Sequence, residues 1–375
     1  MCLKNNRLCS EFSVSGEVGN RVRSIRIGKG IGDVSDQTLT FFKQIGVEDV
    51  HMPTRWNETP NSSPTVRPHV PPTAKGKSGG IGREWDLDEL RRVRQRIADY
   101  ELEATVSGLG LSGNLTMGKD GRESDAEVLR SRIQMAAEVG IEVLTYSFTA
   151  LRASEGYGSI DGGGRGGADL RDFDYDRIKD LAPYETVGTI GYGQMWDNLH
   201  WFLEAVVPTA EAAGVKLAAH PNDPPVPEYR GVAQPLWDYE GWRKLIELVD
   251  SPSNTMFFDT GVTTELGHDA VESIRYFGSR KRIGTVHFRN VKVVAPYYKY
   301  VETFHDDGDA DLNACMQAFF DVGYEGQIDP DHTPGLINDA TGTRAGWAFS
   351  IGQIVAMRNG CESRAGDEGA QESRP

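Results

Sequence analysis

Short apolar runs alternate with segments of helical periodicity along most of the chain. The apolar runs are rich in β-branched residues and four to eight residues long, which is typical of buried strands. We expect eight strands, at residues 22–27, 47–52, 102–107, 141–148, 215–220, 255–259, 284–288 and 326–329. A segment with apolar residues at helical spacing follows each strand, most clearly at 86–100, 125–137, 196–213, 239–249, 269–277, 309–322 and 346–357.

Polar residues and glycines mark the ends of several expected helices. Asp86 and Asp125 stand where N-capping side chains are preferred, and Gly140 and Gly214 follow helix ends, where a left-handed residue is favoured. The unbroken alternation of eight strands with helices predicts an α/β fold, a single (β/α)8 TIM barrel with a parallel closed sheet. An open, doubly wound sheet is the alternative.

The chain divides into three expected parts: an irregular N-terminal segment at 1–20, a barrel catalytic domain at 21–360, and a disordered tail at 361–375. Two long loops interrupt the barrel pattern, at 53–84 after the second strand and at 157–189 after the fourth. In a barrel, both lie at the C-terminal face, where substrates bind. We interpret them either as a lid or as surface insertions.

Composition and charge exclude several classes of function. The 375 residues are 38% hydrophobic and 25% charged, with a formal net charge of −15, which argues against a nucleic-acid-binding surface. No apolar run approaches the roughly 20 residues of a membrane span, and no signal peptide is apparent. The cysteines are Cys2, Cys9, Cys315 and Cys361. Their spacing fits neither a disulfide framework nor a zinc ribbon, so we expect a reducing cytoplasm.

Polar residues stand at the ends of the last four expected strands. These residues are His220, Asp259, His287 and Asp331, separated by 39, 28 and 44 residues, each step about one βα unit. In a barrel, their side chains converge at the catalytic face. Two imidazoles and two carboxylates suit Mn²⁺, Mg²⁺ or another divalent ion, and the absence of a thiolate argues against structural zinc. Asp329 is the alternative fourth ligand.

Several further side chains are candidates for the chemistry. His332 is the first candidate for acid and base work, or else it orients a neighbouring carboxylate. Arg289 and Arg230 offer a bidentate fork to a substrate carboxylate. We expect His51 and His268 to be structural or surface residues. Other candidate contacts to substrate are Asn222, Asp223, His305 and Asp307.

Several motifs together resemble the mannonate dehydratase family. They are His220-Pro-Asn-Asp-Pro-Pro, the Phe-Asp-Thr-Gly turn at Asp259, His287-Phe-Arg-Asn-Val and Pro330-Asp-His332. Upstream, Trp85-Asp-Leu-Asp-Glu-Leu and Tyr146-Ser-Phe148 are similar too, as is Asp306-Asp-Gly-Asp-Ala-Asp311 downstream. The resemblance covers roughly residues 23–358. It implies a metal-dependent, xylose-isomerase-like barrel that dehydrates D-mannonate to 2-keto-3-deoxy-D-gluconate. The implied ligands of Mn²⁺ are His220, Asp259, His287 and Asp331.

The chain departs from this family at two positions. The family usually has a cysteine where this chain has Asp259, and a carboxylate there shifts the preference of the site toward Mn²⁺ or Mg²⁺. The family is also expected to carry a catalytic tyrosine after a glycine before its last helix, where this chain has Trp347. Trp347 has no exchangeable acid of useful pKa, so we place it among the substrate contacts. Tyr146 is the candidate for the missing phenol.

The resemblance predicts a hydro-lyase that acts on a small-molecule sugar acid, with no nucleic-acid or membrane partner. A metal-dependent sugar isomerase or epimerase on a related barrel is the alternative, because it uses a similar ion site to move a proton without loss of water. A sugar-acid-binding protein without activity is a third interpretation, and it predicts lost ligands. The sequence leaves homo-oligomerisation open.

Overall fold

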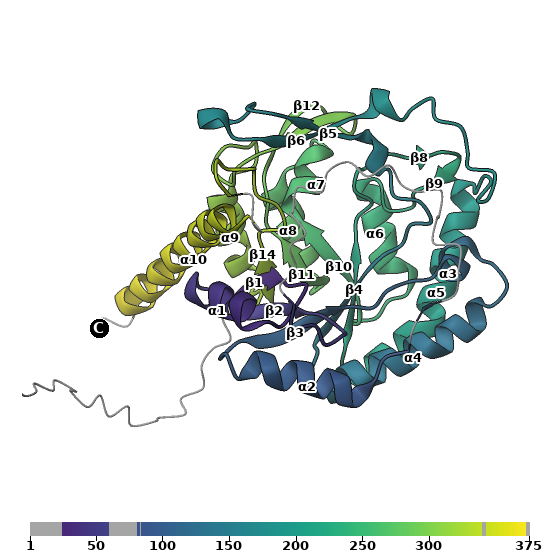
Figure 1. Cartoon of the computed structure of the whole chain (residues 1–375), viewed down its shortest axis with the longest axis horizontal. Coiled ribbons are helices and arrows are strands. Elements are labelled where there is room, and N and C mark those ends of the chain that lie inside the picture. The colour runs from purple at the N-terminus through teal and green to yellow at the C-terminus, as the bar shows by residue number, and fades with distance from the viewer. Residues whose placement is uncertain (1–24, 60–80, 83, 340–342, 373–375) are drawn as a thin grey trace, which may run out of the picture.

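A closed parallel barrel of eight strands forms the centre of the protein (Figure 1). The structure, a computed structural model, describes residues 25–59, 81–82, 84–339 and 343–372. The barrel strands are β1 (Arg26–Gly30), β2 (Asp49–Met52), β3 (Glu103–Gly108), β4 (Val143–Ser147), β7 (Lys216–His220), β10 (Asn254–Asp259), β11 (Ile283–His287) and β14 (Gln327–Asp329). Each strand pairs with its neighbours in the chain, and β14 closes on β1. The predicted (β/α)8 barrel is confirmed, and the open sheet is wrong.

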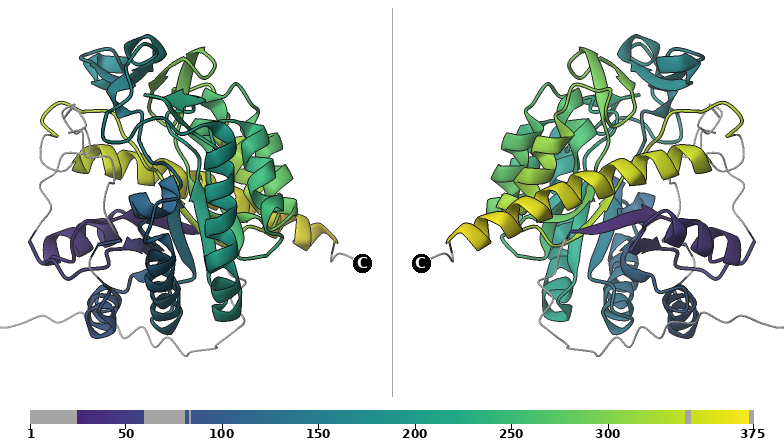
Figure 2. Two further views of the ribbon diagram at one scale, coloured as in Figure 1. Left: turned by 90° about the vertical axis from the view of Figure 1, so that its right-hand side faces the viewer. Right: turned by 90° about the vertical axis from the view of Figure 1, so that its left-hand side faces the viewer.

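Helices surround the barrel and connect successive strands (Figure 2). They are α1 (Asp36–Gln44), α2 (Leu87–Ala98), α3 (Gly113–Met117), α4 (Arg122–Glu138), α5 (Tyr192–Ala213), α6 (Tyr239–Leu248), α7 (Thr260–Glu265), α8 (Ala270–Ser279), α9 (Leu312–Asp321) and α10 (Arg344–Glu372). Asp86 caps α2 as predicted, because its side chain accepts from the Glu89 amide. Gly140 and Gly214 have φ values of 74° and 68°, which confirms their left-handed conformation.

The predicted N-cap at Asp125 is wrong. Helix α4 begins three residues earlier, after Gly121, so Asp125 lies in its first turn and is buried. Its carboxylate accepts hydrogen bonds from the Ser112 hydroxyl at 2.5 Å and the Asn114 amide at 3.0 Å. The sequence places an acidic residue correctly near the positive end of a helix, but this one ties α4 to the preceding turn instead of capping it.

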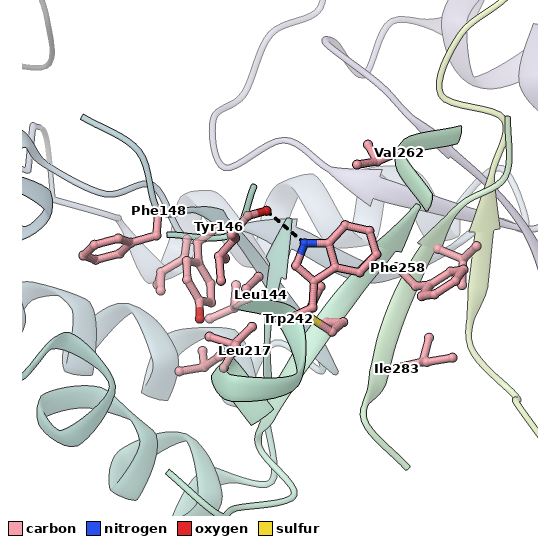
Figure 3. Close-up of a cluster of buried hydrophobic side chains, with 14 of the residues drawn as sticks. Leu144, Tyr146, Phe148, Leu217, Trp242, Phe258, Val262 and Ile283 are labelled. Atoms are coloured by element: carbon pink, nitrogen blue, oxygen red, sulfur yellow. Dashed lines mark hydrogen bonds between the residues drawn. The ribbon is translucent and has the colours of Figure 1, made fainter. Parts of the chain in front are cut away.

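Side chains alternate between the barrel interior and the layer beneath the helices. Val106, Val143, Ala218 and Phe257 form a small apolar cluster inside the barrel. The residues between them on the strands point outward into the main core, as Leu144 and Leu217 do (Figure 3). The alternation decides which residues near a strand's end face the catalytic mouth and which face a helix.

The long segment after β4 is folded rather than irregular. It contains β5 (Tyr157–Ile160) and β6 (Leu170–Asp174), with three-residue 3-10 helices at Ser154–Gly156, Arg165–Gly167 and Tyr175–Arg177. These strands join β12 (Val291–Ala295) and β13 (Lys299–Glu302), which follow β11, in an antiparallel sheet of order β12-β13-β6-β5. We call it the upper sheet; it lies at the C-terminal end of the barrel (Figure 1). A two-stranded ribbon, β8 (Glu228–Tyr229) and β9 (Val232–Ala233), follows β7.

The ends of the chain and the second long loop are described only in part. The predicted irregular segment 1–20 lies outside the described residues, as does most of the loop 53–84. Helix α10 continues to Glu372, so 361–372 are helical where the sequence predicts a disordered tail. Within the described part of the chain, no helix has both the length and the apolar character needed to cross a membrane.

Candidate metal centre

Three adjacent barrel strands bring their terminal polar residues together at the mouth of the barrel. These residues are His220 on β7, Asp259 on β10 and His287 on β11, and Asp259 pairs in register with His287. One potential ligand atom from each residue lies within 4.8 Å of the others. The structure therefore assembles three of the four predicted ligands into one cluster, because parallel strands end at the same edge.

The cluster is organised around one carboxylate oxygen. Oδ2 of Asp259 lies 3.5 Å from Nε2 of His220 and 3.4 Å from Nδ1 of His287, and these two nitrogens are 3.1 Å apart. Oδ1 of Asp259 faces away and accepts from the Val262 amide at 2.8 Å, which caps α7. Asp259 thus combines a helix cap with an oxygen directed at both imidazoles.

The tautomer of His220 is set by the backbone carbonyl of the next residue, Pro221. Nδ1 of His220 lies 2.8 Å from the carbonyl oxygen of Pro221, which can only accept, so Nδ1 carries the proton. Nε2 then presents its lone pair to the cluster, as an imidazole that ligates a metal ion does. Two such nitrogens and one carboxylate oxygen, without a thiolate, fit a divalent cation of the Mn²⁺ or Mg²⁺ type.

The fourth predicted ligand, Asp331, lies on the other side of His287. Its Oδ1 is 3.5 Å from Nε2 of His287, whereas Asp259 faces Nδ1 of the same ring. Asp331 has a φ of 54°, a left-handed conformation that costs energy for a residue with a side chain. Its amide donates to Oδ1 of Asp329 at 2.8 Å. The alternative ligand Asp329 is held by the Lys29 ammonium at 3.0 Å and the Gly30 amide at 2.6 Å.

Arg289, two residues after β11, is enclosed by carboxylates and is 1% exposed. Its Nε lies 3.0 Å from Oδ2 of Asp259 and 3.1 Å from Oδ2 of Asp331. Its two terminal nitrogens lie 2.8 Å from Glu265 and 3.4 Å from Asp223. Each guanidinium nitrogen therefore has a carboxylate partner within the protein. The geometry favours a structural counter-ion over the predicted clamp for a substrate carboxylate.

The charged groups of the site shift the pKa values of its residues in the direction opposite to burial. Burial alone raises the pKa of Asp259, but the charge of Arg289 and the two neighbouring imidazoles bring it far below its usual range. Asp331 behaves similarly: burial raises its pKa, and the charges of His287 and His332 outweigh that effect. Burial lowers the pKa of His287, while Asp331 and Asp259 raise it above its ordinary value. Both carboxylates are therefore ionised at neutral pH.

His332 stands between the metal cluster and the upper sheet. Its Nε2 lies 2.8 Å from Oδ2 of Asp331 and 2.8 Å from a terminal nitrogen of Arg171 on β6. Its Nδ1 lies 3.7 Å from Glu302 on β13, which also binds Arg171 through both carboxylate oxygens. The upper sheet therefore holds the imidazole ring of His332 beside the cluster through Arg171 and Glu302.

Two predicted substrate contacts lie in the loop after β7, and their polar atoms bind other residues of the protein. Asn222 is 4% exposed, and its side-chain oxygen accepts from the Leu236 amide at 2.7 Å. Asp223 accepts hydrogen bonds from the hydroxyls of Tyr157 and Tyr300 and faces Arg289 with its other oxygen. Asp223 thus connects the upper sheet to the cluster.

Arg230 and Asp307 pair with residues away from the cluster. Arg230 binds Glu155 at 2.8 Å and the Ala182 carbonyl at 2.7 Å, so its guanidinium is held within the loops after β4 and β7. Asp307 pairs with Lys292 at 2.5 Å at an exposed position. The structure provides no substrate-clamping geometry for Arg230, because its guanidinium is occupied by Glu155 and the Ala182 carbonyl.

His305 and Trp347 are buried near β14. His305 is 2% exposed, and neither ring nitrogen makes a hydrogen bond of normal geometry with a described residue. Trp347 is 3% exposed, and its ring carries the Lys29 ammonium 4.2 Å from its centre. Lys29 in turn binds Asp329, so Trp347 supports the end of β14 through Lys29.

The prediction that Tyr146 supplies a phenol to the site is wrong. Tyr146 pairs in register with Ala219, and both lie on the outer side of their strands. Its ring packs edge-on against Phe202 of α5, 5.1 Å between centroids, inside the cluster that also holds Leu144 and Phe148 (Figure 3). Ser147, the last residue of β4, is in register with His220, whose side chain faces the cluster. Tyr146 precedes it by one residue and therefore faces the opposite side, because side chains alternate along a strand.

His51, which the sequence predicts to be a structural or surface residue, lies at the mouth of the barrel. It is in register with Val106, which belongs to the interior cluster, so the imidazole points inward. The signal was available: His51 stands one residue before the end of β2, as a polar residue in an apolar strand. The contributions of Arg171, Glu302 and Tyr157 were also missed, because they come from the upper sheet.

Comparison with known proteins identifies the relatives of this chain. The D-mannonate dehydratase (UxuA) family model matches residues 166–359, which include every residue of the metal cluster and His332. Mannonate dehydratase of Thermotoga petrophila is 30% identical over 286 residues, covering 67% of this chain and 79% of that protein.

Solved structures agree with the observed fold. The crystal structure of mannonate dehydratase from Streptococcus suis serotype 2 superposes with a TM-score of 0.75 at 24% identity, covering 92% of this chain and 95% of that one. An L-ribulose 3-epimerase gives a TM-score of 0.52 at 15% identity, covering 94% and 100%. At such identities, these superpositions show the barrel fold alone. The family match and the sequence relative show more: this chain belongs to the D-mannonate dehydratase (UxuA) family.

Proposed function

We propose that the protein dehydrates the sugar acid D-mannonate to 2-keto-3-deoxy-D-gluconate and water, with a divalent ion held by His220, Asp259 and His287. The observation that carries this proposal is the convergence of these three side chains at the barrel mouth in a chain of the mannonate dehydratase family. Active sites of such barrels lie at this face.

The reaction requires loss of a weakly acidic proton next to a carboxylate and loss of a hydroxyl from the next carbon. A bound divalent ion supplies Lewis acidity that stabilises negative charge developing on the substrate carboxylate. We propose Mn²⁺ or Mg²⁺, since the anionic ligand in the cluster is the carboxylate of Asp259. Asp331 is the proposed fourth ligand, because its Oδ2 and Oδ2 of Asp259 both lie beside Nε of Arg289, at 3.1 Å and 3.0 Å.

The protein's own residues hold the site and handle one of the protons. The Pro221 carbonyl keeps Nε2 of His220 free for coordination, and Arg289 balances the buried carboxylates around the cluster. His332 is the proposed acid that protonates the departing hydroxyl, since its ring is partly exposed beside Asp331 and is oriented by Arg171.

The test is direct assay of the metal-loaded protein. Purified protein loaded with Mn²⁺ is incubated with D-mannonate, and the 2-keto-3-deoxy product is followed by its absorbance, with chelator-stripped protein as the control. We expect product only when metal is present. If metal binds but no product forms, the dehydratase proposal fails, and the mixture is then analysed for isomerised or epimerised sugars.

The cellular setting that we propose is a reducing cytoplasm. Two of the cysteines, Cys315 and Cys361, are described by the structure, and both are free and buried. Burial raises the pKa of the Cys315 thiol to about 12, so this thiol is unreactive at neutral pH. Free buried thiols are typical of proteins that work where disulfides are kept reduced.

A further inference from the structure

His51 occupies a place at the barrel mouth that the cluster and His332 do not explain. It lies on β2, and its register partner on β1 is Gly30, whose amide binds Asp329 at the end of β14. Around the barrel, β11, β14, β1 and β2 are consecutive neighbours. His51 therefore belongs to the same ring of strand ends as His287 and Asp329, two strands beyond Asp329.

The imidazole of His51 makes no hydrogen bond to another described residue. Within residues 25–59, 81–82, 84–339 and 343–372, neither of its ring nitrogens has a hydrogen-bonding partner, and the side chain is partly exposed. Its register partners are Gly30 on β1 and the apolar Val106 on β3. Gly108, further along β3, also lies close, since a Cβ there would be 3.9 Å from His51 Nε2. None of these three neighbours offers a polar side chain to the ring.

Other proton carriers near the mouth are unsuitable for a second role. Tyr146 points into the outer layer, Trp347 has no exchangeable acid, and His305 is 2% exposed. The carboxylate of Asp223 is occupied by two tyrosine hydroxyls and Arg289. Dehydration needs one group to accept the proton from carbon and one to protonate the leaving oxygen. With His332 as the acid, a base is still missing.

We propose that His51 is a further catalytic residue, the general base that accepts the proton from the carbon next to the substrate carboxylate, while His332 acts as the acid. This inference rests on the proposed function, and it deepens that function by assigning the second proton carrier.

The step balances without any further reactant. The bond between carbon 2 and its hydrogen breaks, and the proton goes to an unprotonated ring nitrogen of His51. The released electron pair forms the double bond between carbons 2 and 3 as the bond from carbon 3 to its hydroxyl breaks. That oxygen leaves as water with a proton from His332. The enol then becomes the 2-keto product, and proton exchange with solvent resets both imidazoles.

The electrostatic environment supports the basic form of His51. Burial lowers its pKa from 6.5 to about 4, so the imidazole is neutral at pH 7 and can accept a proton. The charged groups that act on it are Asp329, which opposes the shift, and His287 and Lys29, which add to it. These groups come from β14, β11 and β1, the strands that lead from the cluster to β2.

The first test compares His51→Gln with the matched variant His200→Gln, an exposed histidine on α5 that pairs with Glu204. With Mn²⁺-loaded protein and D-mannonate, we expect His51→Gln to lower kcat by about 10²- to 10⁴-fold while metal content and KM stay near wild type. His200→Gln keeps wild-type kcat. Added imidazole restores part of the activity of His51→Ala, which a purely structural role would not allow. A His51→Gln variant with wild-type kcat overturns the inference.

A second measurement does not depend on turnover. The wild-type protein is labelled with ¹⁵N in its eight histidines, loaded with Mg²⁺ and titrated with D-mannonate, and the His51 signals are assigned from their absence in His51→Gln. We expect the His51 ring signals to shift on addition of the sugar acid. Unshifted His51 signals overturn the inference even if the wild type is active. A wild type that makes no product but shows the shift overturns the dehydratase proposal and leaves His51 at the substrate.

Discussion

The Nε atom of Arg289 lies 3.0 Å from Oδ2 of Asp259, the same oxygen that faces His220 and His287. A fixed cation therefore stands beside the anionic member of the proposed metal cluster. The guanidinium also balances Glu265 and Asp223, so the protein can bury several carboxylates close to the proposed ion site. We therefore expect Arg289 to influence both metal binding and folding, and mutation can separate the two effects.

Removal of a cluster residue should remove the ion and the activity together. We expect His220→Ala or Asp259→Ala to weaken Mn²⁺ binding by more than the roughly 10- to 100-fold typical of residues that only orient ligands. Metal content after dialysis, measured by atomic emission, checks this. Asp307→Ala is the matched control, because Asp307 pairs with Lys292 at an exposed position and should keep the metal. Full metal retention by both cluster variants would contradict the assignment of these residues as metal ligands.

Loss of Arg289 should destabilise the fold itself. Arg289→Met leaves Asp259, Glu265 and Asp223 without their shared counter-ion, and breaking a buried ion pair from one side costs about 3–5 kcal/mol. The comparison is Arg243→Met, because Arg243 pairs with Glu240 on the surface of α6, where such pairs contribute about 0–1 kcal/mol. Urea unfolding of metal-free protein gives both values, and equal losses for the two variants would contradict a central role for Arg289.

The barrel could be predicted from the sequence because each strand is a buried β-branched run and each helix has its own periodicity. The segment after β4 could not. Its strand β6 pairs with β13, more than a hundred residues later, and β5 joins the sheet through β6. Such long-range pairing leaves no local signal. Helix α1 was also not singled out, although Ser35 caps it and Leu39 and Phe42 face the core.

The cluster was predictable for the same reason: His220, Asp259 and His287 are polar residues at the ends of apolar strands. The role predicted for Tyr146 is wrong because it depends on which side of the strand the residue faces, and the inward direction of His51 depends on the same alternation. One residue of register separates the inward Ser147 from the outward Tyr146. The partners of His332 could not be predicted from the sequence, because Arg171 and Glu302 belong to the upper sheet.

His332 should be needed for turnover but not for the metal. We expect His332→Gln to lower kcat by about 10²- to 10⁴-fold with unchanged Mn²⁺ content, because its ring contacts Asp331 but lies outside the three-residue cluster. His268→Gln serves as the control, since His268 stacks on Tyr239 at a ring distance of 4.6 Å, away from the cluster. Steady-state kinetics and metal analysis decide the point, and loss of metal in His332→Gln would instead make it part of the ion site.

The buried histidine His305 should make the stability of the fold dependent on pH. Burial lowers its pKa from 6.5 to about 4 in the folded protein, although the Phe288 backbone and Asp306 act in the opposite direction. In the unfolded chain, it titrates near 6.5, so between about pH 6.5 and 4 the unfolded state binds more protons than the folded one. Stability is therefore fully present above pH 6.5 and is lost as the pH falls toward 4.

The expected contribution of His305 over that interval is about 3 kcal/mol, since each pKa unit corresponds to about 1.4 kcal/mol. Urea unfolding of chelator-treated wild type and His305→Gln from pH 8 to pH 4 measures it without competition from metal. The two proteins should run parallel above pH 7, and the variant should lose less stability below pH 6.5. Carboxylates with lowered pKa values, such as Asp259, act mainly at lower pH. His51, whose pKa is also lowered to about 4, contributes equally in both proteins, so the difference between the two curves reports His305. Parallel curves down to pH 4 would show that His305 is not held neutral by burial.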